Sequence, residues 1–364
     1  MKTERPRKRP KLADLAVVDV FCGVGGLSLG LKQAGLRVVA GIDLDPDCRY
    51  PFEHNVGGTF HKADVAELSS DAVAEMYGDA KIKVLAGCAP CQPFSGYTTR
   101  RREIDDRWRL LMDFLRLVQG ARPDVLTLEN VPRLAHLPLW QEFVSGMEAA
   151  GYSVNWAVVD AADFGVPQNR KRIVLMASRL GSIAMPASVE GPRKTVRDVI
   201  GAAPKVAAGS AHQDDTLHRA RALTPINLER IRTARPAETW KRWPEHLRVR
   251  CHTEATGRTY PSVYGRMSWD KPSPTITTQF YGFGNGRFGH PDQDRALTLR
   301  EGALIQSFPA GFEFVPPGAP IIARTVGRLI GNAVPPALGA AIGRVIIAHV
   351  NSQRARTAIR RLDC

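Results

Sequence analysis

Short apolar runs alternate with amphipathic segments along the first half of the chain. Such short, continuous runs are typical of strands that are buried on both faces of a parallel sheet. Strands are predicted at residues 15–21, 38–42, 59–61, 82–86, 125–128, 154–159 and 173–177, and helices at residues 25–34, 65–76, 107–119 and 139–150. This alternation predicts βαβ units and therefore an α/β fold with a parallel sheet. The short link at 164–171 favours an antiparallel hairpin between the last two strands.

The pattern changes near residue 178. Pro, Arg and His become frequent, apolar periodicity fades, and short β-like pieces such as residues 274–280 appear. Helical patterns return at 297–308 and at 335–350, and the second opens with a proline, where proline is tolerated. We expect these late helices to complete the first domain, so that a smaller domain is inserted into it. The predicted division is a basic arm at 1–13, a large domain at 14–180 plus 292–352, an insertion at 181–291 and a basic tail at 353–364.

Positive charge is concentrated in the predicted insertion. The 364 residues carry a formal net charge of +14, and residues 181–290 contain 17 Lys and Arg against 9 Asp and Glu. More than half of the excess therefore lies in less than a third of the chain. A basic protein most often meets nucleic acid, so we expect the insertion to contact a polyanion.

The sequence predicts neither a membrane protein nor a secreted one. We expect no membrane partner, because we find no apolar stretch close to the roughly 20 residues that a span needs. The basic N-terminus is not followed by the apolar core of a signal peptide. The six cysteines are scattered along the chain, which suits a reducing compartment better than a disulfide framework.

The tract GCAPCQPFS, at residues 87–95, holds the first candidate for chemistry. Cys91 follows the predicted strand at 82–86, at the carboxyl end of a sheet strand, where open α/β sheets bind their ligands. Cys88 and Cys91 also have the C-x-x-C spacing of a redox pair, and such a pair can form half of a zinc site. The tract alone leaves a nucleophile, a redox partner, a metal ligand and an inert buried thiol open.

An acid and two arginines are predicted near the same sheet edge. Glu129 ends the predicted strand at 125–128, and a thiol and a carboxylate at two strand ends suggest an active-site pair. In QNRKR, at residues 168–172, Arg170 and Arg172 lie on one side of a strand entry. They either form a solvated basic edge or converge on an anion or on the acceptor atoms of a base.

A glycine-rich turn follows the first predicted strand. Its glycines permit a tight turn and close approach of the backbone to a ligand. The spacing of Gly23, Gly25 and Gly26 departs from G-x-G-x-x-G, which argues against a pyrophosphate site and leaves a smaller nucleoside ligand open. Asp43 stands about 20 residues on, where an acid commonly holds ribose hydroxyls, and Asp64 occupies the matching place after the third strand.

Six tracts, in this order, resemble the DNA (cytosine-5) methyltransferases of prokaryotic modification systems. They are FCGVGG at 21–26, the Pro90-Cys91-Gln92 core, ENV at 129–131, QNRKR at 168–172, RALTLRE at 295–301 and GNAV at 331–334. The resemblance implies a Rossmann-like, S-adenosylmethionine-dependent methyltransferase sheet of the α/β class, with a smaller inserted target-recognition domain. That domain falls on residues 181–291, where residues 275–278 look like the family's short Thr-containing recognition element.

The resemblance also implies a chemistry. Cys91 would add as a thiolate to C6 of a cytosine flipped out of double-stranded DNA, so that C5 becomes able to take a methyl group. Glu129 would bond the cytosine N3 and exocyclic amine. Arg172 would hold the O2 side, with Arg170 supporting it. No metal is implied.

The implied methyl donor is S-adenosylmethionine, with Asp43 at its ribose and Asp64 at its adenine amine. The implied cofactor-binding residues are Phe21, Gly23, Gly25, Gly26, Asp43, Leu44, Asp64, Val65, Pro90, Leu110 and Asn332. The family more often has Glu where Asp43 stands, but a shorter acid still reaches a ribose. The implied DNA contacts are Gln92, Ser95, Arg100, Thr277, Thr278 and Arg287.

The implied partner is double-stranded DNA, and one copy of the chain suffices to flip one base, so we expect a monomer. A role in restriction-modification, a cognate restriction endonuclease acting on the same site and a cytoplasmic, nucleoid-associated location are part of the same expectation. Two alternatives remain: an RNA (tRNA) cytosine-5 methyltransferase and a catalytically silent DNA-binding regulator. A nicotinamide-dependent oxidoreductase is disfavoured by the glycine spacing.

Overall fold

The computed structural model describes residues 14–90, 103–254 and 261–360, and the chain forms two compact units. Unit 1 comprises Met1–Val159, Arg172–Ala187 and Gly339–Cys364, and unit 2 comprises Asp160–Lys171 and Ser188–Leu338. Residues 292–338, which we expected in the large domain, cluster with unit 2. The assignment of target recognition to residues 181–291 stays a prediction, because compactness alone does not show which residues contact DNA.

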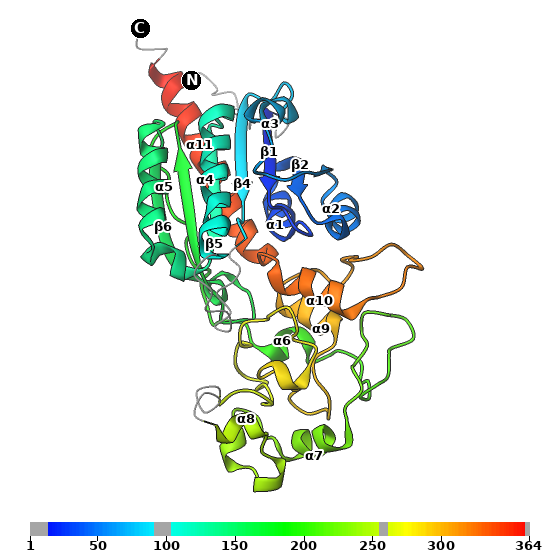
Figure 1. Cartoon of the computed structure of the whole chain (residues 1–364). Coiled ribbons are helices and arrows are strands. Elements are labelled where there is room, and N and C mark those ends of the chain that lie inside the picture. The colour runs from blue at the N-terminus through cyan, green and yellow to red at the C-terminus, as the bar shows by residue number, and fades with distance from the viewer. Residues whose placement is uncertain (1–13, 91–102, 255–260, 361–364) are drawn as a thin grey trace, which may run out of the picture. The chain divides into compact units, whose positions relative to one another are not determined.

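The strands of unit 1 form one seven-stranded sheet in the order β3-β2-β1-β4-β5-β7-β6 (Figure 1). They are β1 (Leu15–Val20), β2 (Arg37–Asp43), β3 (Thr59–Lys62), β4 (Ile82–Gly87), β5 (Val125–Asn130), β6 (Ser153–Asp160) and β7 (Lys171–Ser178). Neighbours from β3 to β5 pair in parallel, whereas β7 pairs antiparallel with β5. The predicted α/β class is confirmed, and the sheet is mixed because β7 runs antiparallel to β5. The last two predicted strands, β6 and β7, are neighbours in the sheet.

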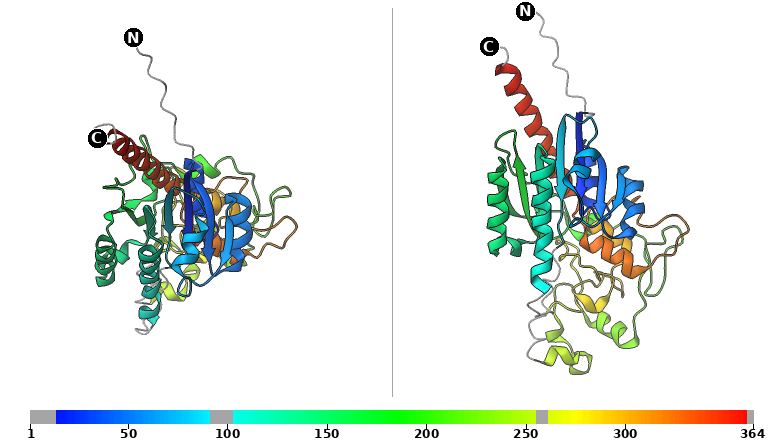
Figure 2. Two further views of the ribbon diagram at one scale, coloured as in Figure 1. Left: turned by 90° about the horizontal axis from the view of Figure 1, so that it is seen from above. Right: turned by 45° about the horizontal axis from the view of Figure 1, so that its top comes forward.

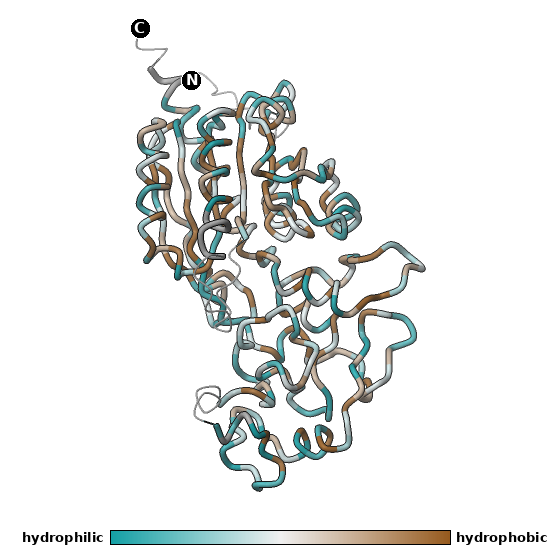
Figure 3. The backbone as a smooth tube through the Cα atoms, in the orientation of Figure 1, coloured by the Kyte–Doolittle hydropathy of each residue, from teal (hydrophilic) through white to brown (hydrophobic). Residues whose placement is uncertain are grey.

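Helices cover the sheet of unit 1. They are α1 (Gly26–Ala34), α2 (Arg49–Val56), α3 (Ser70–Met76), α4 (Glu103–Ala121), α5 (Pro138–Ala149) and α11 (Pro336–Arg360). Figure 2 shows α4 and α5 on one side of the sheet and α11 on the other. Every residue of β1 and of β5 is therefore buried. Along α4 and α5, hydrophobic and hydrophilic residues alternate at helical spacing (Figure 3), and Phe114, Trp140 and Phe143 lie in the core.

The segment predicted as a helix at 65–76 is helical only from Ser70. The side chain of Ser69 caps α3 by accepting the N–H of Ala72 at 3.1 Å. The preceding residues form turns, whose carbonyls at Val65 and Leu68 accept the guanidinium of Arg116 on α4 at 2.8 Å each. The first part of the prediction is wrong because this tertiary contact holds the chain in a turn.

Unit 2 contains short helices joined by long connections. They are α6 (Val196–Ile200), α7 (Pro225–Thr233), α8 (Arg250–Thr253), α9 (Leu299–Ile305) and α10 (Ala323–Asn332). No strand occurs among the described residues from 188 to 338, so the β-like prediction at 274–280 is wrong. The isolated bridge between Gln168 and Ser273 lies just before that segment, and residues 278–280 form a turn. Hydrogen bonds from Ile276 to Gln168 and from Thr275 to Asn169 hold the start of the segment.

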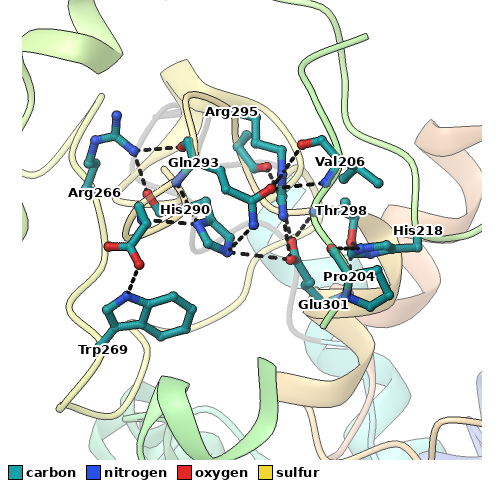
Figure 4. A network of polar contacts seen from close by, with 12 residues as sticks. Pro204, Val206, His218, Arg266, Trp269, His290, Gln293, Arg295, Thr298 and Glu301 are labelled. Atoms are coloured by element: carbon teal, nitrogen blue, oxygen red, sulfur yellow. Dashed lines mark hydrogen bonds and ion pairs between the residues drawn. The ribbon is translucent and has the colours of Figure 1, made fainter. Parts of the chain in front are cut away.

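A buried polar network organises unit 2 (Figure 4). Arg295 and Glu301 are both fully buried and form a bidentate ion pair, with N–O distances of 2.7 and 2.8 Å. The N–H of Thr298 donates to Glu301 at 2.8 Å, while the guanidinium of Arg295 also reaches the carbonyl of Val206 at 3.0 Å. The tract from 295 to 301 therefore has a structural role that its sequence alone did not suggest.

His290 lies beside this ion pair as a neutral imidazole. Its Nδ1 accepts the N–H groups of Asp292 and Gln293 at 3.1 and 3.0 Å, so the ring proton belongs on Nε2. Nε2 faces Glu301 at 3.8 Å. Burial lowers the pKa of His290 to about 4, although Glu301 opposes that shift.

Stability should therefore fall on acidification between about pH 6.5 and 4. In that range the unfolded chain binds a proton at His290 and the folded chain does not, so up to about 3 kcal/mol of the free energy of unfolding is lost. His290→Gln should remove this part of the slope in urea titrations at pH 7 and 4.5. His136→Gln, which removes an exposed imidazole of unit 1, is the control for the substitution itself. An unaltered slope in His290→Gln would contradict the assignment.

One described helical stretch, Ala323–Arg356, is long and apolar enough to cross a membrane by length and composition, with a mean hydropathy of 1.5. The expectation that no such stretch exists is therefore wrong. Of its most apolar window, 67% is buried inside the structure. A buried core helix passes the same test, so the stretch is weak evidence for a membrane span.

Candidate active site

The turn after β1 combines an unusual backbone with an open face. Phe21 has a φ of 62°, in the left-handed region that costs a residue with a side chain about 1–3 kcal/mol. Gly25, at φ +85°, is needed for packing, since a Cβ there would lie 2.7 Å from Cγ2 of Val56. A Cβ at Gly23 would meet nothing within 4 Å. This side of the turn, just before α1 begins at Gly26, is open to a ligand.

Asp43, the last residue of β2, holds this turn. Its Oδ2 accepts the N–H of Gly23 at 2.9 Å, and its Oδ1 accepts the N–H of Asp45 at 3.0 Å. Burial raises the pKa of Asp43, and these N–H donors partly oppose the shift. Each carboxylate oxygen can still accept a further donor. The carbonyl of Asp43 accepts the N–H of Ala63 at 3.2 Å, which places Asp64 beside the end of β2.

The remaining predicted cofactor residues of unit 1 differ in exposure. Leu44 is 60% exposed, which is unusual for a large apolar side chain. Asp64 is half-buried and accepts the N–H of Ala66 at 2.9 Å. Leu110 is half-buried, Pro90 is exposed, and Val65 is buried in the core. An apolar surface at Leu44 therefore adjoins the carboxylate of Asp43.

A second acid near this turn was missed in the sequence. Asp19, on β1, is 1% exposed, and its Oδ2 accepts the hydroxyl of Ser28 at 2.6 Å. Burial raises its pKa to about 7, although the Ser28 hydrogen bond opposes the shift. A charged residue inside an otherwise apolar strand was the signal available.

A buried carboxylate marks the end of β5. Glu129 is 3% exposed, and its Oε1 lies 3.0 Å from Nε of Arg172 in an ion pair. Its Oε2 accepts the thiol of Cys88 at 3.0 Å. Because β7 runs antiparallel to β5, with Ile173 opposite Asn130, the start of β7 brings Arg172 to this edge. The structure thus unites the predicted acid with one of the two predicted arginines.

Cys88 and Asn130 were missed as partners at this edge. The side-chain amide of Asn130 donates to the carbonyl of Ala89 at 3.1 Å and so fixes the chain that leads towards Cys91. Gly87 pairs with Leu128 in the parallel pairing of β4 with β5. This register, had it been known, would have indicated that the next residues, Cys88 and Glu129, lie side by side. Cys91, Gln92, Ser95 and Arg100 lie outside the residues that the structure describes.

Arg170 and Gln168 have structural partners within unit 2. The guanidinium of Arg170 is buried and donates to the carbonyls of Ile276, Gly331 and Ala333 at 3.0, 3.1 and 3.2 Å. Oε1 of Gln168 accepts the N–H of Ile276 at 2.8 Å. These hydrogen bonds connect two of the six tracts, residues 168–172 and 331–334, with residues 275–278. They give Arg170 a supporting role in positioning the chain.

The hydrogen bonds of Arg170 and Gln168 to Ile276 also hold the predicted recognition segment, residues 275–278. Thr277 is exposed and Thr278 half-buried, and their main chain lies against α10, where a Cβ on Gly331 would be 2.5 Å from the carbonyl oxygen of Thr277. Arg287 is half-buried, and Asn332, at the end of α10, is exposed. Their contacts with DNA or cofactor stay predictions.

A glycine turn, strand-end acids and an Arg–Glu pair on a mixed α/β sheet are the parts of a methyltransferase of the kind that the sequence resembles. The sequence profile for C-5 cytosine-specific DNA methylases matches residues 15–348, and the chain belongs to this family. The resemblance is therefore confirmed, and the protein is a DNA cytosine-5 methyltransferase.

Curated relatives are similar over nearly their whole length. The chain is 44% identical to the type II methylase M.HgiDII of Herpetosiphon aurantiacus over 350 residues, which are 95% of this chain and 98% of that protein. It is 33% identical to the type II methyltransferase M1.HphI of Haemophilus parahaemolyticus, over 92% of this chain and 87% of that protein.

Solved structures share the fold. A protein described as a DNA modification methyltransferase of an E. coli prophage superposes with a TM-score of 0.73 at 22% identity, over 93% of this chain and 99% of the other. The DNMT2 structure from Spodoptera frugiperda gives 0.64 at 14% identity, over 91% and 99%. At these identities the likeness supports the fold alone.

Proposed function

We propose that this methyltransferase acts on C5 of a cytosine flipped out of double-stranded DNA, through a transient bond between the thiolate of Cys91 and C6. The observation that carries the proposal is the buried carboxylate of Glu129, held by Arg172 on one oxygen at the ligand-binding edge of the sheet. A carboxylate there accepts the exocyclic amine of cytosine and bonds its N3, and both contacts distinguish cytosine from thymine.

The chemistry follows from the electronic needs of the pyrimidine ring. When the sulfur of Cys91 adds to C6, the C5–C6 double bond opens and its electron pair becomes available at C5. Glu129 favours this step by passing a proton to N3, where negative charge would otherwise build up, and it takes the proton back when the double bond is restored. Arg172 holds the O2 side. After C5 has gained its methyl group, a base such as water takes the C5 proton, and the electron pair left at C5 restores the double bond as the sulfur of Cys91 leaves.

The residues around the first turn fit S-adenosylmethionine. When bound, this cofactor supplies an electrophilic methyl group. The open face at Gly23 admits a ligand close to the backbone, Asp43 has acceptor capacity for ribose hydroxyls, and the exposed side chain of Leu44 offers an apolar surface to an adenine ring. Asp64, which follows the hydrogen bond of Ala63 to the end of β2, is proposed to accept the adenine amine. Phe21, Gly25, Gly26, Val65, Pro90, Leu110 and Asn332 complete the proposed cofactor set.

Base flipping requires a contribution from DNA contacts, because unstacking a base costs a few kcal/mol. The basic residues of unit 2 and the exposed Thr277 support such contacts. Thr278, Arg287, Gln92, Ser95 and Arg100 are proposed to join them. Phosphate contacts would provide affinity, and groove contacts would select the site.

The names of the relatives suggest a biological setting. Both relatives are named as type II enzymes, so we place this enzyme in a modification system, acting as a monomer in the cytoplasm near the nucleoid. A cognate restriction endonuclease of the same specificity would then be its partner. Sequencing methylated cytosines in DNA from cells that express the chain would identify the site.

Cys91→Ser should abolish methyl transfer and leave cofactor binding intact. Duplex DNA with 5-fluorocytosine at the identified site should form a stable covalent complex with the wild-type enzyme, because the fluorine at C5 cannot leave as a proton does. The complex is measured as a shifted band on a denaturing gel. Cys48→Ser, at a buried cysteine outside the tract at 87–95, is the control and should still form it.

Two outcomes would contradict this proposal. The first is the absence of a covalent complex with any DNA when the cofactor is present, which would favour a silent DNA-binding regulator. The second is transfer of labelled methyl groups to tRNA in preference to DNA, which would indicate the RNA enzyme.

A further inference from the structure

Cys88 stands where three strands end, and the proposed reaction leaves it without a role. Its main-chain N–H donates to the carbonyl of Val20, the last residue of β1, at 3.3 Å. Its thiol donates to Oε2 of Glu129, at the end of β5, at 3.0 Å. One residue at the end of β4 therefore connects the strand that leads into the cofactor turn with the carboxylate that is proposed to bind cytosine.

The carboxylate of Glu129 needs more than one partner to keep a single orientation. The last torsion of a glutamate side chain is broad, so contact at one oxygen leaves the carboxylate plane free to rotate. Arg172 forms an ion pair with Oε1, but among the described residues Oε1 accepts no hydrogen bond, whereas Oε2 accepts the thiol of Cys88. The thiol therefore supplies the directional contact on the carboxylate. At 3% exposure, Glu129 has little water to replace either partner.

We propose that Cys88 is a positioning residue for cytosine recognition. Its S–H group holds Oε2 so that the carboxylate of Glu129 meets the N3 and amine edge of the flipped base in one orientation. The proposal rests on the role proposed above for Glu129, and Cys88 acts only through that residue. A donor to an ionised acceptor is stronger than one to a neutral acceptor, which makes even a thiol effective here.

Packing is the alternative role, and the exposure of the cysteines argues against it. Cys88 is half-buried, whereas Cys22 and Cys48 are buried. Removing the sulfur of Cys88 should therefore disturb the core less than removing that of Cys48. The hydrogen bond, and not the volume, is the feature to test.

The test is single-turnover methyl transfer with saturating cofactor and the identified DNA site. Cys88→Ala should lower the rate constant about tenfold, the effect of losing a hydrogen bond to a charged group. Cys88→Ser keeps a donor and should stay within about threefold of wild type. Dissociation constants for S-adenosylmethionine and for DNA should not change, and Cys48→Ala, the control, should transfer at the wild-type rate.

A double variant with Glu129→Ala distinguishes a positioning role of Cys88 from a packing role. If Cys88 acts through Glu129, Cys88→Ala should not lower the rate constant further in an enzyme that already carries Glu129→Ala. Because that enzyme is slow, its methyl transfer is followed over hours. Cys88→Val, which has volume but no donor, replaces Cys88→Ala if the latter does not fold.

Either of two results overturns the positioning role: a wild-type rate in Cys88→Ala, or equal losses in the alanine and serine variants. Both results count only if the wild-type enzyme forms the covalent complex with 5-fluorocytosine DNA. Without that complex the proposed function fails first, so the two failures are distinguishable.

Discussion

Glu129→Gln should lower the rate of methyl transfer by about 10³-fold, within the range of residues that bond a reacting group in the transition state. The amide keeps the shape of the side chain, but it cannot serve the ring N3 and the exocyclic amine as the carboxylate does. The loss should appear in the single-turnover rate constant, with the dissociation constant for S-adenosylmethionine unchanged, because Glu129 lies at β5 and the cofactor turn follows β1.

Glu142→Gln provides the matched control, since Glu142 is an exposed acid on α5. It should transfer methyl groups within about twofold of the wild-type rate. A Glu129→Gln enzyme that retains more than a tenth of the wild-type rate would show that the buried carboxylate is structural, with its ion pair to Arg172 as its main function.

Glu301→Gln should destabilise the folded chain by about 3–5 kcal/mol, because it leaves the fully buried guanidinium of Arg295 without its counter-charge. The effect is measured as a lower free energy of unfolding in urea. Replacing both partners, as Arg295→Met with Glu301→Leu, should cost less than the single change, since no charge then stays buried.

An exposed pair supplies the comparison. Arg242 and Glu238 lie 3.1 Å apart with 78% and 34% of their side chains exposed, and Arg242→Met should change stability by less than about 1 kcal/mol. Similar losses in Glu301→Gln and Arg242→Met would mean that the Arg295–Glu301 pair contributes no more than a surface contact does.

Most of the sheet was predictable because its strands are buried on both faces. Runs such as residues 15–21 and 125–128 are apolar apart from Asp19 and Thr127, and no other element of that length buries such a run as well. The strand-end acids followed from this, because parallel strands place their carboxyl ends at one edge. The start of α3 and the form of residues 274–280 were not predictable, because contacts from distant residues, Arg116 and Gln168, hold them.

The candidate site likewise has residues that the sequence predicted and contacts that only the structure decided. Residue types and their order identified Glu129, Arg172, Asp43 and the glycine turn, because the chemistry of a pyrimidine and of a nucleoside cofactor needs those groups at strand ends. Which guanidinium meets the carboxylate was decided by the antiparallel register of β7 with β5. The partners of Arg170 were decided by buried carbonyls far along the chain.

The sequence by itself determined the α/β class, the family and the kinds of group available for catalysis, since these depend on local pattern and residue chemistry. Only the tertiary structure decided that the thiol of Cys88 faces Glu129 and that Arg295 and Glu301 stabilise unit 2 from within. Such contacts depend on register and burial, which are set by the packing of segments that lie far apart in the chain.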